Sequence, residues 1–141
     1  MNTMRVKQLF FDRQAVMNAM DKATRRVLSR FGAFVRSTAR RSIRKRKRPS
    51  LPGQPPSSHQ GHLKRFLFFS YDPAARSVVI GPVKLGSKKG STPEVLEYGG
   101  VSVNRRKGKT TRSVISARPY MGPAFKKEES KLAGLWRDSV R

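Results

Sequence analysis

The first third of the chain has the residue spacing of a helix with one buried face. Asp12 is a suitable N-cap residue. After it, side chains on one helical face recur every three or four residues, at Val16, Met20, Ala23, Val27, Phe31, Phe34, Thr38 and Ser42. We therefore predict a helix from Arg13 to Lys47. At about 1.5 Å per residue it would be roughly 50 Å long, so we expect it to kink near Gly32 or to project at its C-terminal end.

The pattern before and after this helix is different. Residues 1–11 form a short apolar lead-in, which predicts a strand or a segment docked on the core. Leu63–Tyr71 is rich in aromatic and aliphatic side chains and predicts a strand. Ser77–Gly81 predicts a second strand, and the turn residues 72–75 between them indicate an antiparallel hairpin. A loop rich in Gly, Ser and Lys follows from Lys84 to Thr92.

The last third of the chain predicts another pair of strands and a helix. Pro93–Tyr98 is suited to one helical turn, which Gly99 and Gly100 would end. Val101–Asn104 and Arg112–Ala117 are the predicted strands, and apolar residues at helical spacing predict a helix from Gly122 to Ser139. The expected class is α+β, with a long N-terminal helix and a C-terminal helix packed on one small antiparallel sheet. We expect a single domain over residues 1–141.

The charge of the chain changes this picture from an ordinary small domain to one that attracts acidic partners. The 141 residues include 32 Lys and Arg against 8 Asp and Glu, a formal net charge of +24. Such a field favours polyanions or acidic protein surfaces and opposes compaction. The chain has no cysteine, which excludes disulfides and thiolate metal sites. No apolar run is long enough for a membrane span and no signal peptide is evident, so we expect neither a membrane protein nor a secreted one.

Two basic segments are candidates for contact with DNA or with an acidic partner. The first is the end of the predicted helix, at Arg40, Arg41, Arg44, Lys45, Arg46, Lys47 and Arg48. The second is the tip between the last two strands, at Arg105, Arg106, Lys107 and Lys109. Several phosphates could be bound by the first segment, with an affinity that falls steeply with salt. A solvated arm and a contact for an acidic protein are the other interpretations.

The sequence contains no convincing catalytic or metal-binding set. Glu94 and Glu97 could share a helical face, but carboxylates in so basic a chain are better explained by ion pairs. His59 and His62 are three residues apart in a segment without further His or Cys, which favours exposed or hydrogen-bonding side chains over a metal site. We predict a protein without enzymatic activity, cofactor or metal.

The segment between the first helix and the first hairpin, residues 49–62, is a proline-rich connector. It holds four of the nine prolines. Proline fixes φ and pushes the preceding residue toward extended geometry, so the connector should be stiff, irregular and laid on the surface. A stiff surface segment is suited to presenting a fixed shape to a partner.

Four segments, in order, resemble the neck and tail-completion proteins of tailed bacteriophages with long non-contractile tails. The first, Pro52-Gly53-Gln54-Pro55-Pro56-Ser57-Ser58-His59-Gln60-Gly61-His62-Leu63-Lys64, is similar to the pattern PGxPPxxHxGxLK of that family. The later segments are Ile80-Gly81-Pro82, Glu94-Val95-Leu96-Glu97-Tyr98-Gly99-Gly100 and Ala117-Arg118-Pro119-Tyr120-Met121-Gly122-Pro123-Ala124.

The resemblance implies a virion structural protein at the head-to-tail junction, assembled in the host cytoplasm as a ring around the DNA channel. Its partners would be further copies of itself, other neck, portal-side and tail-tube proteins, and the DNA in the channel. The interface residues would be Pro52, Gly53, Pro55, Pro56, His59, Gly61, Leu63, Glu97, Gly99, Arg118, Pro119, Tyr120, Met121 and Pro123. The basicity departs from the family, whose tubes are thought to repel DNA, so we expect the two basic segments at subunit interfaces or against acidic neighbours. The alternative is a ribosomal or nucleoid-like nucleic-acid-binding protein.

Overall fold

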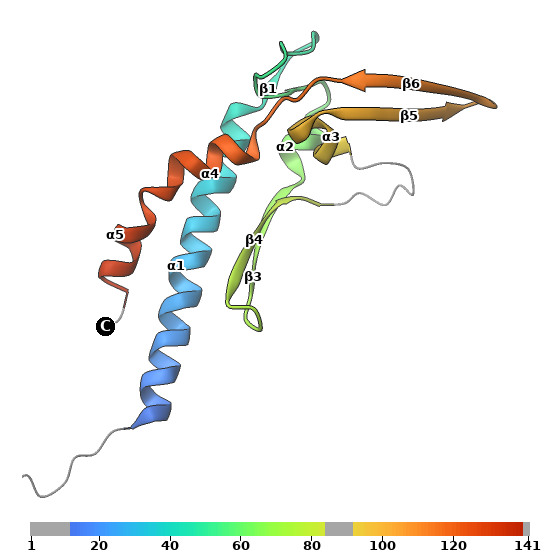
Figure 1. The fold of residues 1–141 in the computed structure, drawn as a ribbon. Helices are drawn as coiled ribbons and strands as arrows, with labels where there is room; N and C mark the ends of the chain where they lie inside the picture. Colours follow the sequence, from blue (N-terminus) through green and yellow to red (C-terminus); the bar gives the residue numbers. More distant parts are fainter. Residues whose placement is uncertain (1–11, 84–91, 140–141) are drawn as a thin grey trace, which may run out of the picture.

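A long helix is the spine of the molecule, and the other elements are arranged along it (Figure 1). The computed structural model describes residues 12–83 and 92–139. The predicted lead-in at residues 1–11 and nearly all of the predicted loop after Lys84 lie outside these residues. Within them, two C-terminal helices run along one side of the spine and a β-hairpin runs along the other, while a second hairpin extends away from the body. The α+β class is confirmed.

The spine, α1 (Arg13–Ser42), begins as predicted but ends five residues early. At its start, the Asp12 carboxylate accepts a hydrogen bond from the Ala15 amide at 2.9 Å. At its end, Ile43 adopts extended geometry and is fully buried, so the chain leaves the helix to place this side chain in the core. Continuing the helix would also stack like charges at i, i+4 spacing through residue 48, which is unfavourable.

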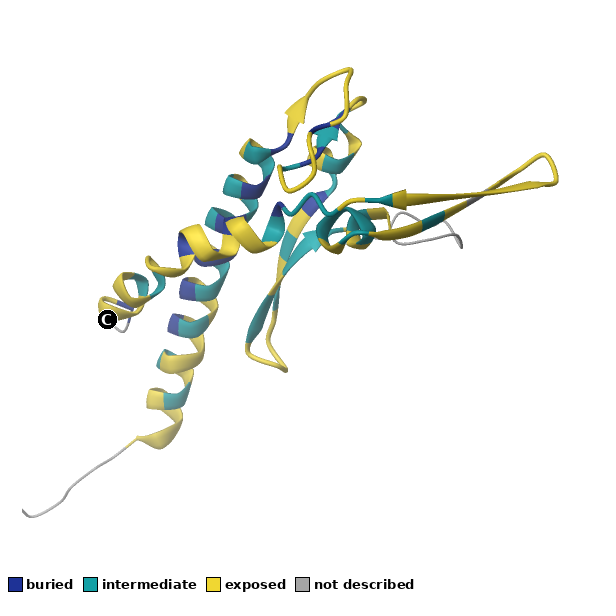
Figure 2. Ribbon diagram, turned by 45° about the horizontal axis from the view of Figure 1, so that its top comes forward, coloured by how far each residue is buried: buried dark blue, intermediate teal, exposed yellow. Residues whose placement is uncertain are grey.

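The prediction that the C-terminal end of this helix projects was wrong. The buried positions of α1 run from Ala23 to Ala39, whereas the first two turns are largely exposed, so the projecting end is the N-terminal one (Figure 2). The helix also runs continuously through Gly32. A Cβ atom at Gly32 would lie 2.8 Å from Val78 Cγ2 and 2.9 Å from Phe69 Cδ2, so this glycine lets the first hairpin approach the helix closely.

The first hairpin pairs β3 (Leu67–Asp72) with β4 (Ser77–Pro82) in the predicted antiparallel arrangement. The Asp72 carboxylate accepts hydrogen bonds from the Ala74 and Ala75 amides, which fixes the turn. The predicted start of the first strand was wrong, because a short helix, α2 (His62–Arg65), comes first. Gly61 has φ +82° and its carbonyl accepts from the Arg65 amide, so the connector ends in a helical turn before the strand begins.

The main core lies where α1, β3 and α4 (Met121–Glu129) meet. Its buried side chains are Phe31, Val35, Ala39, Ile43, Leu67, Tyr120 and Ala124. The single C-terminal helix that we predicted is two helices, with α5 (Leu132–Arg137) following a break at residues 130–131. At this break the Lys131 amide donates to the Glu128 carbonyl, while its ammonium group pairs with the Glu128 carboxylate.

The strands do not form the one sheet that we predicted. The second hairpin pairs β5 (Gly100–Arg106) with β6 (Lys109–Ile115), and β1 (Arg44–Lys45) pairs in parallel with β2 (Ser57–Ser58). These pairs and the first hairpin are three separate two-stranded sheets. The first hairpin is held against α1, whereas the second follows α3 (Thr92–Tyr98), so the two hairpins do not share an edge.

Among the residues that the structure describes, no helix combines the length and the apolarity needed to cross a membrane.

Candidate functional site

The segments that carry the family resemblance meet at one junction in the structure. The Gly53 amide of the connector donates to the Ala117 carbonyl at 2.8 Å, and the Arg118 side chain donates through Nε to the Ser50 carbonyl at 3.0 Å. The Arg118 amide donates to the Leu96 carbonyl at 2.6 Å. The connector, the end of α3 and the segment before α4 are therefore bonded together, although up to 68 residues separate the partners.

The remaining segment, Ile80-Gly81-Pro82, joins the junction through the first hairpin. Pro82 lies opposite Leu67 in the register, and the Val83 amide donates to the Phe66 carbonyl at 2.9 Å. Phe66 directly follows α2, into which the connector leads. All four segments thus belong to one continuous part of the molecule.

Glu97 organises the start of α4. Its carboxylate accepts hydrogen bonds from three successive backbone amides, those of Tyr120, Met121 and Gly122, at 2.8 to 3.0 Å. The first amides of a helix have no partner within the helix, and a negative charge there also favours the helix dipole. Glu97 is therefore a helix cap supplied from another element, and its carboxylate is occupied inside the subunit.

Tyr120 is buried beside this cap. Burial raises its pKa to about 12, and the negative charge of Glu97 adds to the effect. Its ring is only 1% exposed and belongs to the main core. The residue therefore anchors the junction to the core and is not itself on the surface.

Gly99 is required by the close approach of two backbone segments. It has φ +77°, and a Cβ atom there would lie 3.1 Å from the Ala117 amide nitrogen and 3.2 Å from the Ile115 carbonyl oxygen. Neither backbone atom can move without disturbing β6 or the junction. A glycine at this position thus allows α3 to end against the last residue of β6 and the segment that follows it.

The predicted interface residues fall into three groups by exposure. Pro56 and Tyr120 are buried, so they cannot contact a partner directly. Partly buried members are Pro55, Gly61, Leu63, Glu97, Gly99, Arg118, Pro119 and Met121, and exposed members are Pro52, Gly53, His59 and Pro123. The structure brings this set together, while its role in contacts between subunits stays a prediction.

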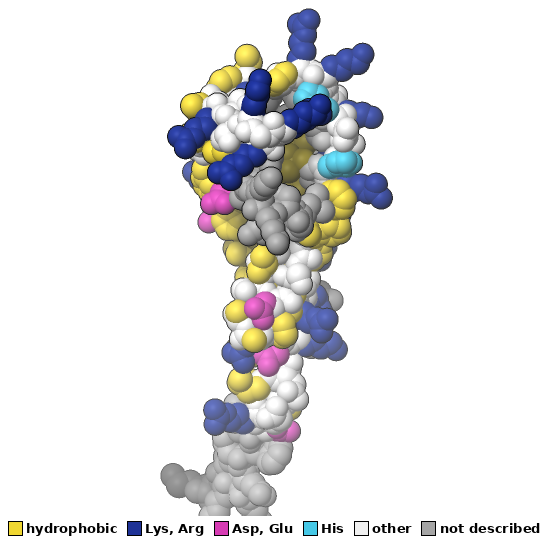
Figure 3. Space-filling view, turned by 90° about the vertical axis from the view of Figure 1, so that its right-hand side faces the viewer, with side chains coloured by type: hydrophobic (Ala, Val, Ile, Leu, Met, Phe, Trp, Pro, Cys, Tyr) yellow, Lys and Arg dark blue, Asp and Glu magenta, His cyan; other side chains and the backbone are white. Residues whose placement is uncertain are grey.

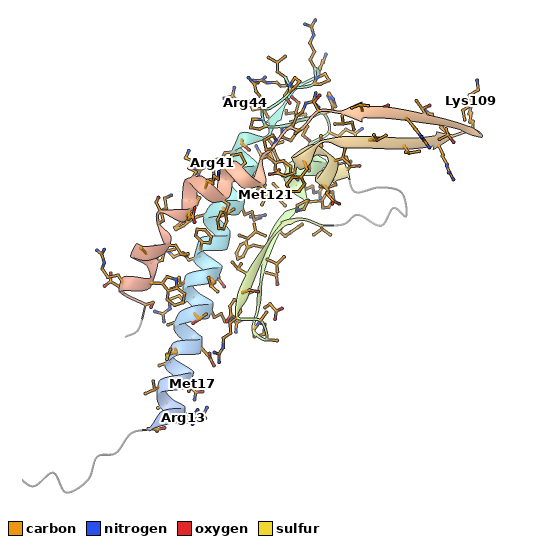
Figure 4. All side chains as sticks on the ribbon, viewed as in Figure 1. Arg13, Met17, Arg41, Arg44, Lys109 and Met121 are labelled. Carbon is orange, nitrogen blue, oxygen red and sulfur yellow. The ribbon has the colours of Figure 1, made fainter. Side chains whose placement is uncertain are left out.

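The two basic segments lie far apart on the molecule. Arg40 and Arg41 are in the last turn of α1, and residues 44–48 run along the exposed surface beside the connector. Figure 4 shows Arg41 and Arg44 at this end of α1 and Lys109 at the far tip of the second hairpin. In Figure 3, many blue Lys and Arg side chains project from the upper part of the face, beside yellow hydrophobic ones, and magenta carboxylates are sparse.

A pocket separates the basic end of α1 from the connector. Its volume is about 330 Å³. It is lined by Arg41, Ser42, Arg44, Arg46, Ser50, Gln54, Pro55, Pro56 and Ser57. Sequence reasoning identified the arginines as a run but missed Ser50 and the pocket itself, since nothing local shows that β1 pairs with β2 and folds the connector back over the run.

The second hairpin exposes an apolar face. Val101 lies opposite Val114 in the register, and Val103 lies opposite Arg112, so the three valines share one face with Arg112. The other face carries Ser102 and Ser113. The valines are exposed, Val114 by 86%. Most of the second hairpin is coloured as exposed in Figure 2. We call Val101, Val103 and Val114 the open face; alternation along each predicted strand could have indicated it, but the register was needed to join the two strands.

The described residues contain no cluster of three or more His, Cys, Asp or Glu that could hold a metal ion. Of the carboxylates that we considered, Glu97 caps α4 and Glu94 is exposed on α3. His59 is exposed, and His62 lies 6.0 Å from the Phe66 ring, centroid to centroid.

No protein-family model, curated protein or solved structure matches this chain.

Proposed function

We propose that this chain is a structural protein of a phage head-to-tail junction, either a neck or tail-completion subunit or a tail terminator. It acts by assembling into a ring and docking onto neighbouring rings, without catalysis. The proposal combines the family resemblance of the junction segments with one observation, the open face of the second hairpin.

The contacts within the second hairpin are not enough to stabilise it. A two-stranded hairpin is at best marginally stable in water unless its apolar face is covered. The main contact of this one outside its own strands is with α3, and Val101, Val103 and Val114 lie exposed together with the neighbouring Tyr98. An exposed apolar patch on a projecting element, with both strand edges unpaired among the described residues, is typical of an assembly surface.

Self-assembly through the open face can be tested by measuring the molecular mass of the protein in solution. We expect the wild-type protein to form an oligomer by light scattering at about 0.1 M and about 0.5 M salt, without DNA, because apolar contacts are not screened. The variant Val101→Thr, Val103→Thr, Val114→Thr keeps the strand propensity and the shape but places hydroxyls on the open face, so it should be monomeric.

The matched control changes the opposite face. Ser102→Thr with Ser113→Thr should leave the oligomer intact, which would separate a contact on the open face from a general effect on the hairpin. A wild-type protein that is monomeric in both buffers, and that binds duplex DNA with an affinity falling steeply with salt, would contradict the proposal. That outcome would favour the nucleic-acid-binding alternative, for which the exposed basic segments are suited.

A further inference from the structure

The pocket between α1 and the connector gathers three arginines on one side. Arg41 comes from the last turn of α1, Arg44 from β1, and Arg46 directly follows β1. The opposite side is formed by the connector, where Pro55 and Pro56 give an apolar wall and Ser50, Gln54 and Ser57 give polar groups. The lining therefore contains three cations and no acid.

Within residues 12–83 and 92–139, no acidic side chain pairs with these arginines. All 8 acidic residues of the chain lie within the described residues, and the ion pairs found there are Arg76 with Asp21 and Lys131 with Glu128. A fixed cluster of like charges is unfavourable by itself and becomes favourable when an anion binds it. The pocket therefore carries positive charge that no neighbouring acidic side chain of the described residues balances.

The walls of the pocket are held in place before any ligand arrives. The Ser50 carbonyl accepts from Arg118, the Gly53 amide donates to the Ala117 carbonyl, and β1 pairs with β2, which places Arg44 opposite Ser57. Ser50 is 8% exposed, and its hydroxyl has no hydrogen-bond partner among the described residues. A buried polar group without a partner is costly and marks a place where a further polar atom fits.

We propose that this pocket binds a carboxylate side chain from an acidic segment of a protein partner. Arginine is suited to this because its guanidinium group binds carboxylates with two parallel hydrogen bonds. The proline wall would cover the aliphatic stem of a glutamate, and Gln54 and Ser57 supply further polar groups on the connector side of the pocket. The inference rests on the proposed joining function for the nature of the partner, a neighbouring acidic protein.

The shape of the pocket favours a protein carboxylate over DNA. Phosphates of a duplex are arranged along the outside of a rod and are bound mainly by exposed side chains on a ridge or helix face. A pocket of about 330 Å³ with one apolar wall, formed by Pro55 and Pro56, is instead at the lower end of the size range of sites that hold a small group. The exposed cations outside the pocket, such as Lys47 and Arg48, remain able to contact phosphates.

The test compares a short acidic peptide with DNA. The probes are a fluorescein-labelled hexaglutamate peptide and a labelled duplex, each titrated with the full chain at about 0.15 M salt. The first variant, Arg41→Gln, Arg44→Gln, Arg46→Gln, should lower peptide affinity by about tenfold or more, as expected when charge-assisted hydrogen bonds are lost. Its control, Arg105→Gln, Lys107→Gln, Lys109→Gln, removes the same charge from the second hairpin and should change peptide affinity by less than about threefold.

A second variant fills the pocket without changing the charge. Gln54→Trp places a large side chain on an exposed lining residue and should also weaken peptide binding by about tenfold, whereas Gln60→Trp, on an exposed residue outside the lining, should not. This variant keeps the proposal testable if the triple arginine variant does not fold.

The outcomes separate the alternatives. Equal loss of peptide binding in the pocket and hairpin triple variants, or full binding by Gln54→Trp, would overturn the pocket as the site. If the Arg41, Arg44 and Arg46 variant loses DNA binding but retains peptide binding, the proposal of a carboxylate site is also overturned, and the pocket is assigned to phosphate. The self-assembly test changes residues on the second hairpin only, so failure of the pocket proposal leaves that test unaffected. Failure of the self-assembly test likewise leaves the peptide-binding test of the pocket unaffected.

Discussion

Single residues in this chain act mainly by joining segments that are distant in sequence. Glu97, Arg118 and Gly99 each connect the end of α3 to the segment before α4. The Glu97 carboxylate and the Arg118 backbone amide do so by hydrogen bonds, and Gly99 does so by leaving space. None of these contacts is between neighbours along a helix or a strand. The junction therefore depends on a few residues, and we expect their replacement to lower the stability of the whole subunit.

Replacing Glu97 by Gln should destabilise the protein by about 1–3 kcal/mol, because a charged acceptor of three amides is lost and a neutral amide cannot replace it. Chemical denaturation would measure this change. The control is Glu94→Gln on the same helix, an exposed position that should change stability by less than about 0.5 kcal/mol. Equal effects of the two substitutions would contradict the capping role.

At the scale of elements, α4 and α5 are attached to α1 by both apolar and polar contacts. Phe31 and Phe125 pack edge to face with ring centroids 5.6 Å apart. The Thr38 hydroxyl of α1 donates to the Glu128 carboxylate of α4 at 2.6 Å, and Lys131 pairs with the other oxygen of that carboxylate. Glu128 is buried, so it is ionised in the core only because these two partners are present.

This attachment predicts a pH dependence. Hydrogen bonds from Lys131 and Thr38 lower the pKa of Glu128 below its usual 4.5, against the opposing effect of burial. A lowered pKa in the folded state means that the stabilisation is complete above about pH 4.5 and is lost as the pH falls through the lower folded-state value.

Urea denaturation of the wild type and Glu128→Gln would test this dependence. The difference in free energy of unfolding should be largest near neutral pH and should shrink below about pH 4. Glu129→Gln, at the exposed neighbouring position, is the control and should give a smaller difference. A Glu128→Gln effect that is the same at about pH 7 and about pH 3 would show that the carboxylate charge is not involved.

At the scale of the whole molecule, the net charge of +24 is the dominant property. Basic side chains lie at the end of α1, along the exposed surface beside the connector and at the tip of the second hairpin, while the core that opposes their repulsion is small. Such repulsion destabilises the folded state and is reduced by salt.

The thermal midpoint should therefore rise when sodium chloride is increased from about 0.05 M to about 0.5 M, as the Debye length shortens. Scanning calorimetry would measure it. Lys107→Glu with Lys109→Glu lowers the net charge by four at an exposed tip and should reduce the dependence on salt. A midpoint that falls as salt is added would mean that attractive ion pairs outweigh the repulsion.

Local patterns in the sequence were sufficient to predict most of the elements. The N-cap at Asp12, the turn at Asp72 and the helical turn before Gly99 depend on interactions within a few residues, and all three were predicted correctly. The C-terminal end of α1 and the break between α4 and α5 were not predicted. Ile43 leaves its helix to enter a core built from distant residues, and Glu128 and Lys131 bond across the break.

The candidate site was predicted only in part for the same reason. Residue types and motifs in the sequence identified the basic run, the connector and Glu97, because charge, proline content and resemblance are visible along the chain. The pocket, the open face and the cap at Tyr120 required pairings between residues far apart in sequence. The sequence by itself thus determined the charge, the turns and the type of most elements through local backbone preferences. The tertiary structure alone decided which faces are covered, since burial depends on contacts that form only when distant segments meet.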